Sequence, residues 1–359
     1  MTEDEIAEKA WKQYEQDKDA EAFFSNVSSV GYALGFRLPY YKALVLHKNG
    51  RDKDAAGYIA LAISHFEGIV RNKRCNENCS AKCGNQLYRL GYTINYNIGD
   101  HDRTKQYSIK GVQYDPMKSD YDDNDFVDLY SFRRYNQYSI QDLINNEITV
   151  VSPSEMNDPF DSIYNLYRDL DNLATIFPEE NDILGFYDMF NYYRVRSFVK
   201  GNSSKNIKNI LMWSHYTDGH KGFCIKYRLS KHFINTPTEN GNLCLKNIRY
   251  TNKPIVARCN SIDNDTAFAT KNKHWEYEQE ARLISYDVST ESPFFAHSLD
   301  DTSSIKTIYF GYRCEMKAKE TIYNIVKSKY PTCIFKQMTI DTSNNIYNLI
   351  AQPFNYKRK

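Results

Sequence analysis

The stretch LMWSHYTDGHKGFCIKY, residues 211–227, decides the class of fold because a helix and a strand follow each other within it. Its first part has the spacing of a short helix, in which Met212, His215 and Tyr216 share one side. An Asp-Gly pair, which commonly ends a helix, comes next. GFCIKYRL then has the composition of a β-strand. Short helices and strands are therefore expected to be interleaved in this region.

The C-terminal part of the chain repeats this irregular mixture. Strand-like runs include FVDLYSFR, EITVVSP, YRVRSFV, EARLISYDV and IKTIYFGY, and helical runs between them include YSIQDLINN and PEENDILGFYDMFNYY. These runs do not alternate in the regular β-α-β order of a doubly wound sheet. The sequence therefore predicts an α+β domain with a mixed sheet over residues 126–350.

The N-terminal part, residues 1–97, has helical periodicity. RLPYYKALVLHKNGRDKDAAGYIALAIS predicts a helical hairpin, in which Pro39 lies in a first turn and Gly50 ends the first helix. Asp52 or Asp54 then begins the second helix. The hairpin resembles a tetratricopeptide-type repeat, and the alternative is a generic helical bundle. The polar residues 98–125 lack a period and predict a linker or a long surface loop.

Charge and hydropathy narrow the classes of function. Forty-six basic and forty-five acidic residues leave a net charge of +1, so charge predicts neither broad nucleic-acid binding nor attraction to a membrane surface. No run reaches the roughly 18 apolar residues of a spanning helix, and the N-terminus is charged. A cytoplasmic protein without a membrane partner is therefore expected.

Three cysteines have a spacing that suggests a metal site. Cys75, Cys79 and Cys83 occur in CNENCSAKC, where a helix would place them on one face. Zinc requires a fourth ligand, and His65 or His101 are the nearest candidates. The alternative is a helix face of reduced cysteines.

Common nucleotide-binding and hydrolase motifs are absent from the sequence, which leaves polar and aromatic clusters beside predicted strands. Arg133 and Arg134 end the first strand, and the turn Asn157-Asp158-Pro159 follows the second. An arginine at a strand end can bind a phosphate or a carboxylate. The alternative is a solvated arginine and an ordinary turn.

A second cluster lies in the opening stretch, where a planar ligand could stack on the aromatic side chains. For Trp213, His215 or Tyr216 taken singly, core packing is the alternative.

The third cluster is KNKHWEYEQEARLISYDV, which we expect to be extended. One face would then carry the charged residues Glu276, Glu278, Glu280 and Arg282, with Lys273 as a further compensating cation. The functional interpretation is a catalytic carboxylate, and the alternative is a solvated edge strand.

These blocks resemble a known bacterial family. LYSFR, SPSEMNDPFD, MWSHYTDGHKGFCIKY and KHWEYEQEARL, in this order, are similar to motifs of the domain of unknown function 2971, over roughly residues 128–310. That family name implies no activity.

A second resemblance is to the ADP-ribosyltransferases, and it implies a split-sheet α+β fold and NAD as substrate. In that layout Arg133 would hold the NAD phosphate and ribose, and Ser197 would be the middle serine. Glu280, preceded by Glu278, would stabilise the positive charge that forms as nicotinamide leaves. The chain departs from the layout because SFV lacks the full Ser-Thr-Ser. Arg134, Ser214 and Glu276 are therefore alternatives for these three roles, and Glu278 and Glu280 can exchange theirs.

The resulting expectation is an ADP-ribosyltransferase or NAD glycohydrolase that acts as a bacterial toxin or phage-defence effector. The helical module would bind a partner, and the acceptor would be a protein or a nucleic acid. The ligand pocket would be lined by Trp213, Ser214, His215 and Tyr216. We expect Glu280→Gln to abolish NAD cleavage and to leave folding intact.

Two alternatives follow from the same clusters. One is a non-enzymatic nucleic-acid or nucleotide binding protein that uses Arg133, Arg134, Trp213 and Tyr216. The other is a metal-dependent nuclease that uses Asp158, Glu278 and Glu280. The enzymatic expectation requires Arg133, the aromatic segment and the acidic strand to line one common cleft.

Overall fold

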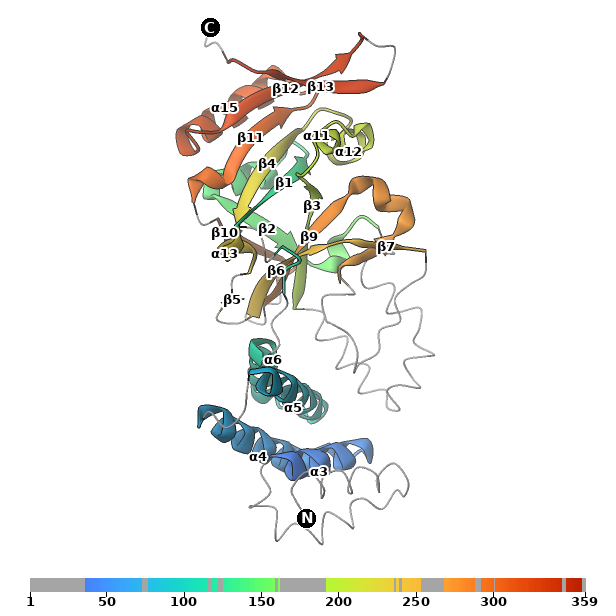
Figure 1. The fold of residues 1–359 in the computed structure, drawn as a ribbon, viewed down its shortest axis with the longest axis vertical. Helices are drawn as coiled ribbons and strands as arrows, with labels where there is room; N and C mark the ends of the chain where they lie inside the picture. The colour runs from blue at the N-terminus through green and yellow to red at the C-terminus, as the bar shows by residue number, and fades with distance from the viewer. Residues whose placement is uncertain are drawn as a thin grey trace.

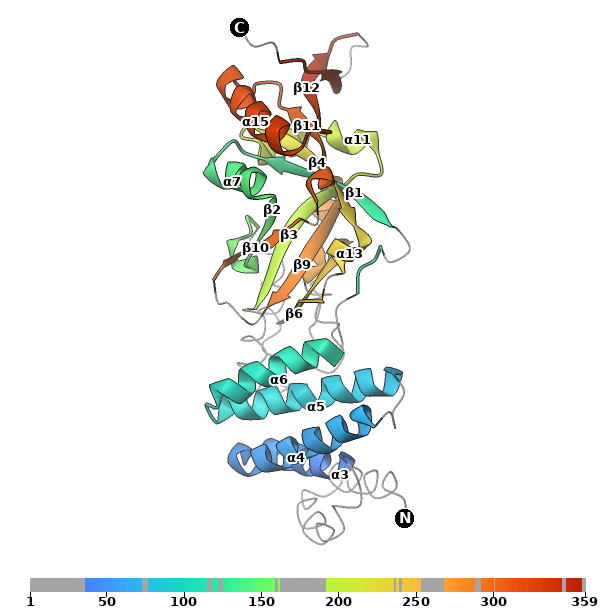
Figure 2. The ribbon, with the colours of Figure 1, turned by 90° about the vertical axis from the view of Figure 1, so that its left-hand side faces the viewer.

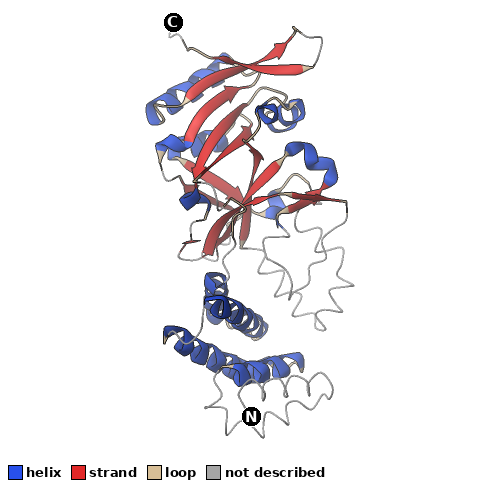
Figure 3. Cartoon of the chain, viewed as in Figure 1, coloured by secondary structure: helices blue, strands red, loops and turns tan. Residues whose placement is uncertain are grey.

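A computed structural model gives the arrangement of most of the chain. It describes residues 36–72, 77–114, 118–121, 125–158, 161, 192–235, 237–238, 241–252, 268–287, 292–299, 301–343 and 347–356. Residues 178–191 of the predicted helical run 178–193 lie outside these ranges, as does Cys75. Figure 3 shows helices without strands at one end of the molecule and strands with further helices in the rest.

The N-terminal helices confirm the predicted hairpin. Helix α3 (Arg37–Lys48) ends before Gly50, whose φ of 70° suits glycine, and α4 (Asp52–Arg71) carries Asp52 and Asp54 in its first turn. Helix α5 (Glu77–Asn97) packs against α4. Together these helices bury a separate apolar core.

The predicted linker at residues 98–125 is wrong over much of its length, because helix α6 (His101–Tyr114) occupies it. Its buried face combines Tyr107 with the small polar residues Thr104 and Ser108, which hide the helical period. Gly91 of α5 allows the Tyr107 ring to approach closely, since a Cβ there would meet that ring at 2.8 Å. Tertiary packing therefore forms a helix that the apolar pattern does not show.

The C-terminal part forms one large mixed sheet, which confirms the α+β class (Figure 1). Its strand order is β13-β12-β11-β4-β1-β3-β9-β6-β5, and β2 pairs with both β3 and β10. The neighbouring strands are antiparallel except β11 and β12. The strands are β1 (Phe126–Arg133), β2 (Glu147–Val151), β3 (Tyr193–Lys200), β4 (Phe223–Ser230), β5 (Pro237–Thr238), β6 (Gly241–Asn247), β9 (Glu280–Asp287), β10 (Phe294–Ser298), β11 (Ile305–Phe310), β12 (Ile334–Asp341) and β13 (Asn348–Pro353).

Shorter elements complete the domain. Strands β7 (Arg249–Thr251) and β8 (Thr270–Asn272) form a small parallel sheet. The remaining helices and 3₁₀ turns are α7 (Gln137–Asn145), η2 (Pro153–Glu155), α11 (Ser204–Ile207), α12 (Ile210–Tyr216), α13 (Lys231–Ile234), η3 (Lys273–Glu278), η4 (Thr302–Ser304) and α15 (Met316–Lys329).

Helices cover both faces of the sheet, as Figure 2 shows for α7 and α15 on one side and α11 on the other. Alternate residues of β1 serve the two faces. Leu129 packs in one core with Leu143 of α7 and Ile322 of α15, whereas Phe132 packs in the other core with Trp213 of α12. The sheet is therefore fixed between two apolar layers.

The helical region meets the sheet through α6 and β6. The Ser108 and Tyr286 hydroxyl groups also form a hydrogen bond between α6 and β9. Among the described helices, none has the length and apolar content needed to cross a membrane.

Candidate functional site

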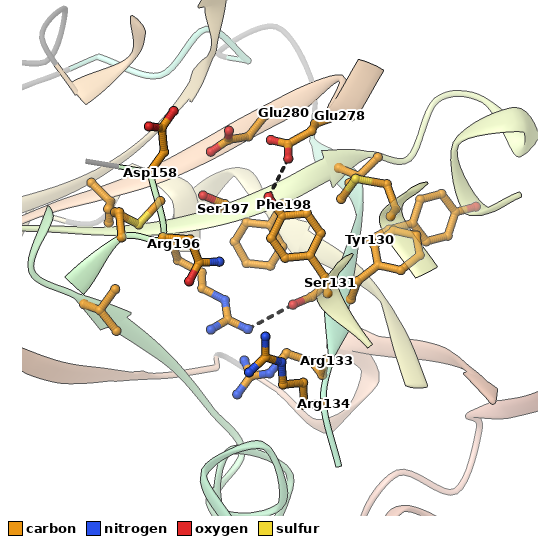
Figure 4. A pocket seen from close by; sticks show the side chains of 18 of the residues that line it. Tyr130, Ser131, Arg133, Arg134, Asp158, Arg196, Ser197, Phe198, Glu278 and Glu280 are labelled. Atoms are coloured by element: carbon orange, nitrogen blue, oxygen red, sulfur yellow. Dashed lines mark hydrogen bonds between the residues drawn. The ribbon is translucent and has the colours of Figure 1, made fainter. Parts of the chain in front are cut away.

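The candidate site is a cavity of about 320 Å³ between strands β1 and β3 (Figure 4). The two strands pair only at Leu129 with Lys200 and at Tyr130 with Val199. Beyond these pairs they separate, although β1 continues to pair with β4 and β3 with β9. The cavity fills the resulting split in the sheet.

One wall of the cavity carries three guanidinium groups. Arg133 is the last residue of β1 and is held by α7, because its Nη2 lies 3.0 Å from Asp142 Oδ2 and its Nε donates to Ser139 Oγ at 3.1 Å. Arg134 is exposed, and within the described chain it makes no ion pair. Arg133 therefore has a carboxylate partner already, whereas Arg134 does not.

Arg196 is the third guanidinium of this wall, and the sequence-based interpretation did not identify it as a site residue. It comes from β3, and its Nη2 donates to Ser131 Oγ of β1 at 3.0 Å. This hydrogen bond spans the split between the strands. The Arg196 guanidinium also lies 6.0 Å from the centre of the Phe198 ring.

The opposite wall carries Glu278 and Glu280, which Figure 4 shows across the cavity from Arg133 and Arg134. The predicted extended conformation is wrong before Glu280, because residues 273–278 form the 3₁₀ turn η3. Asn272 caps that turn, with its side chain accepting a hydrogen bond from the His274 amide.

One residue with a left-handed backbone conformation lies between Glu278 and Glu280 at the end of η3. Gln279 has a φ of 49° and joins η3 to β9. Glu278 and Glu280 are both buried and line the cavity, whereas Glu276 is exposed. Glu276 is therefore excluded as a lining residue.

Glu280 belongs to a buried network of ion pairs. Its Oε1 lies 2.7 Å from Arg282 Nη2, and its Oε2 accepts from Lys271 Nζ at 3.1 Å. Arg282 also donates from both Nη atoms to Asp161, at 2.8 Å each. The predicted compensating cation Lys273 is exposed, and Lys271 takes that place.

Glu278 stands at the edge of this network, and its side chain is only 4% exposed. Its Oε2 accepts from Lys271 Nζ at 2.7 Å, and its Oε1 accepts from the Tyr216 hydroxyl at 2.5 Å. Burial raises the pKa of Glu278 above the ordinary value, although Lys271 acts in the opposite direction. A carboxylate with a raised pKa beside a cavity is a candidate for acid–base chemistry.

The aromatic segment of α12 enters the cavity only in part. Met212 and Tyr216 line it, whereas His215, which was expected to share their side of the helix, does not. Trp213 is fully buried, contacts Phe132 edge to face and donates from Nε1 to the Ile207 carbonyl oxygen. It is a core residue and does not line the cavity.

Ser214 and His215 are exposed and lie outside the cavity lining, so they are wrong as pocket residues. A seven-residue helix presents its residues in several directions, and the helical period did not show which side faces the ligand. Ser197, the candidate for the middle serine, lines the cavity. Its Oγ is buried and has no hydrogen-bond partner in the described residues, so a ligand could supply one.

The cysteine cluster can be described only at Cys83, which is half-buried in α5. Cys75 and the side chain of Cys79 lie outside the described residues. Among the side chains that are described, no group of three or more His, Cys, Asp or Glu residues could hold a metal ion. The zinc site stays a prediction.

Several lining residues were missed by sequence reasoning. Lys271 and Trp275 lie in the stretch KNKHWEYEQEARL. The one indication of Lys271 in the sequence was that the nearby carboxylates require a compensating cation. Asp161 gave no signal, because it follows a turn and meets Arg282 only in the fold.

Comparison with known proteins finds one match, which covers part of this site. No curated protein and no solved structure shows significant similarity to the chain. Residues 212–283 match a family model described as "Protein of unknown function (DUF2971)". The match is narrower than the sequence motifs predict. It contains the cavity residues of α12 and, of the carboxylate wall, Lys271, Trp275, Glu278 and Glu280, but not Asp161, β1 or β3.

Proposed function

We propose that the protein cleaves the bond between ribose and nicotinamide in NAD, within the cavity between β1 and β3. The observation that carries this proposal is the opposite charge of the two walls, with guanidinium groups facing a buried carboxylate cluster. NAD has the complementary arrangement, because its pyrophosphate is anionic and its nicotinamide ring is cationic. The split mixed sheet also agrees with an ADP-ribosyltransferase-like fold.

The arginine wall supplies the phosphate contacts in this proposal. Arg134 and Arg196 line the cavity without a carboxylate partner in the described chain, so their N–H groups can bind the pyrophosphate. Arg133, which the sequence favoured for this role, is paired with Asp142 and holds α7 against β1. It contributes positive charge rather than the main contact.

The carboxylate wall supplies the negative charge. Among the described side chains, three carboxylates (Asp161, Glu278 and Glu280) lie with two cations (Lys271 and Arg282), which leaves this group with an excess of one negative charge. A fixed negative charge stabilises the positive charge that develops on the ribose as nicotinamide leaves. The aromatic ring of Trp275, which lines the same wall, can stack on the nicotinamide.

Glu278 is the carboxylate on which cleavage depends. Glu280 is occupied by Arg282 on one oxygen and by Lys271 on the other, so its charge is already paired. Glu278 shares Lys271 with Glu280 and otherwise accepts only a neutral hydroxyl proton. The excess charge of the cluster is therefore placed mainly on Glu278.

The proposal is tested by incubating the full chain with NAD and measuring released nicotinamide by chromatography. We expect Glu278→Gln to reduce release on the order of 10³-fold, because it removes the excess charge. Glu276→Gln is the matched control, since Glu276 lies on the same 3₁₀ turn but is exposed. Wild-type protein that binds ADP-ribose but releases no nicotinamide would contradict the proposal.

A second candidate, nucleic-acid binding without catalysis, is favoured by one observation. Tyr138 is 70% exposed at the cavity rim, where Arg134 also lies, and such a pair can stack on a base and bind a phosphate. Trp213 cannot take part because it is buried. A gel shift whose affinity falls with salt, in a protein inactive on NAD, would support this candidate.

The helical region is proposed to bind a protein partner of the enzyme, as a repeat-like module would. What supports this role is the separate core of α3 to α6, which makes the region a distinct surface next to the sheet. In the same proposal the enzyme acts in the cytoplasm as a toxin or phage-defence effector, and its acceptor is a protein or a nucleic acid. A pull-down with residues 36–114 deleted would lose the partner if the module binds it.

A further inference from the structure

The hydrogen bonds of the carboxylate wall single out one atom that could react with a ligand. Each oxygen of Glu280 accepts from Arg282 or Lys271, and each oxygen of Glu278 accepts from Lys271 or Tyr216. Both glutamates are buried. Each oxygen of Glu278 keeps a further lone pair, but these hydrogen bonds hold both glutamates within the wall.

The Tyr216 hydroxyl is in a different position. Tyr216 is half-buried, lines the cavity and donates its proton to Glu278 Oε1 at 2.5 Å. The phenolic oxygen keeps two lone pairs, and within the described chain no donor is bonded to them. An oxygen nucleophile whose proton already points to a carboxylate base has the arrangement that nucleophilic catalysis needs.

We infer that Tyr216 is the nucleophile of the reaction and that Glu278 is its general base. This inference rests on the proposed function, and it adds a covalent intermediate on Tyr216. The geometry that supports it is the short hydrogen bond between the two side chains at the cavity wall.

The first step forms one bond and breaks another. The Tyr216 oxygen attacks the anomeric carbon of the nicotinamide ribose, and the bond from that carbon to the nicotinamide nitrogen breaks. The bonding electron pair leaves with nicotinamide, which becomes neutral, and the phenolic proton moves to Glu278. Lys271, bonded to both glutamates, keeps the Glu278 carboxylate oriented during this transfer.

In the second step, water or another acceptor attacks the same carbon and the bond to Tyr216 breaks. Glu278 returns its proton to the tyrosine oxygen, and the attacking water releases one proton to solvent. Two displacements at one carbon give net retention of configuration, as in retaining glycosidases.

The proton transfer to Glu278 must accompany the attack. Burial, with Glu278 next in effect, raises the pKa of Tyr216 above its ordinary range, so the phenolate does not form in advance. The raised pKa of Glu278 makes its carboxylate a stronger base than an exposed glutamate.

Product stereochemistry tests the inference without any variant. With wild-type protein, NAD and methanol as acceptor, the methyl glycoside of ADP-ribose can be assigned by the NMR signal of its anomeric proton. Since the nicotinamide bond of NAD is β, we expect the β-methyl product. The α-methyl product or a mixture of both would overturn the tyrosine role.

Trapping tests the residue itself. An NAD analogue with fluorine at C2 of the nicotinamide ribose, in the arabino configuration, keeps a good leaving group but slows the second step. We expect one fluoro-ADP-ribosyl group per chain by intact mass, located on Tyr216 by peptide mapping. A label on Glu278, or none while nicotinamide is released, would overturn the inference.

Variants separate catalysis from packing. Tyr216→Phe should lower kcat on the order of 10³-fold, while the dissociation constant for ADP-ribose changes by less than about threefold. Tyr277→Phe is the matched control, because Tyr277 is a neighbouring aromatic residue outside the cavity lining. A Tyr216→Phe variant that changes only KM would show a positioning role and overturn the inference.

The two proposals fail in different ways. If wild-type protein releases no nicotinamide, the proposed function and the tyrosine role fail together. If nicotinamide is released and the product is inverted, or Tyr216→Phe keeps its kcat, only the tyrosine role fails.

Discussion

The two walls of the cavity are built in different ways. The carboxylate wall is a closed network in which Lys271, Glu280 and Arg282 are each at most 5% exposed and each bonded to charged partners. On the arginine wall, Arg134 is exposed and Arg196 donates only to a neutral hydroxyl. The first wall is fixed before any ligand arrives, whereas the second keeps donors for a ligand.

This difference separates two tasks that one site must perform. Fixed charges stabilise a transition state because they need no reorganisation during the reaction. Unpaired guanidinium groups gain hydrogen bonds only when an anion binds. Substitutions on the carboxylate wall should therefore lower stability or turnover, whereas those on the arginine wall should weaken ligand binding.

The largest expected loss of stability comes from Arg282→Met. The substitution removes the cation that binds both oxygens of Asp161 and one partner of Glu280, and both carboxylates stay buried. We expect the free energy of unfolding to fall by about 3–5 kcal/mol in chemical denaturation. Arg134→Met is the matched control on the arginine wall. It should change the free energy of unfolding by less than about 0.5 kcal/mol. Equal losses of unfolding free energy in the two variants would contradict the proposed difference between the walls.

The two glutamates should differ in the same measurement. Glu280→Gln loses charged partners on both oxygens, and we expect a loss of about 2–3 kcal/mol, which revises the expectation that folding stays intact. Glu278→Gln leaves two carboxylates with two cations, so its loss should stay within about 1 kcal/mol. A less stable Glu278→Gln than Glu280→Gln would contradict the assignment of the excess charge.

The arginine wall should respond in affinity. Arg134→Ala and Arg196→Ala should each weaken ADP-ribose binding about tenfold in calorimetry, because each removes a charged donor to a phosphate. Arg133→Ala should instead lower stability, since Asp142 would remain buried without its guanidinium. Unchanged affinity for ADP-ribose in the Arg134→Ala and Arg196→Ala variants would show that the arginine wall does not bind the ligand.

The smallest expected effect is a shift in the pH dependence of nicotinamide release. Burial raises the pKa of Glu278, so the carboxylate that cleavage needs is lost as pH falls through a value above the ordinary pKa of glutamate. Folding stability depends on pH in the opposite direction. The contribution of Glu278 to stability is full below the pKa that it has in the unfolded chain, and it is lost as pH rises through the higher pKa that it has in the folded protein. A pH–rate profile of nicotinamide release that falls only at the ordinary pKa of glutamate would contradict the raised value.

Much of the fold follows from local patterns in the sequence. Strand β1 (Phe126–Arg133) coincides with the predicted run, because β-branched and aromatic residues mark its extent. The helical hairpin follows equally from Gly50 and the acidic residues after it. By contrast, the run from Trp275 to Glu278 alternates like a strand but lies in a 3₁₀ turn, because Asn272 caps that turn and Gln279 ends it.

The site was less predictable because its contacts join distant segments. The sequence indicated Arg133, Tyr216, Glu278 and Glu280 as candidates on three separate segments, and all four line one cavity. Ion-pair partners leave no such signal. Arg133 meets Asp142 only because α7 folds back on β1, and so the arginine with free donors could not be chosen from sequence.

One structure would test the central claim most directly, namely that both walls hold one NAD molecule. Crystals of the Glu278→Gln variant with NAD should show the pyrophosphate against Arg134 and Arg196. The nicotinamide ribose should lie beside position 278 and the Tyr216 hydroxyl. NAD bound elsewhere, or bound with its pyrophosphate away from both arginines, would contradict the account.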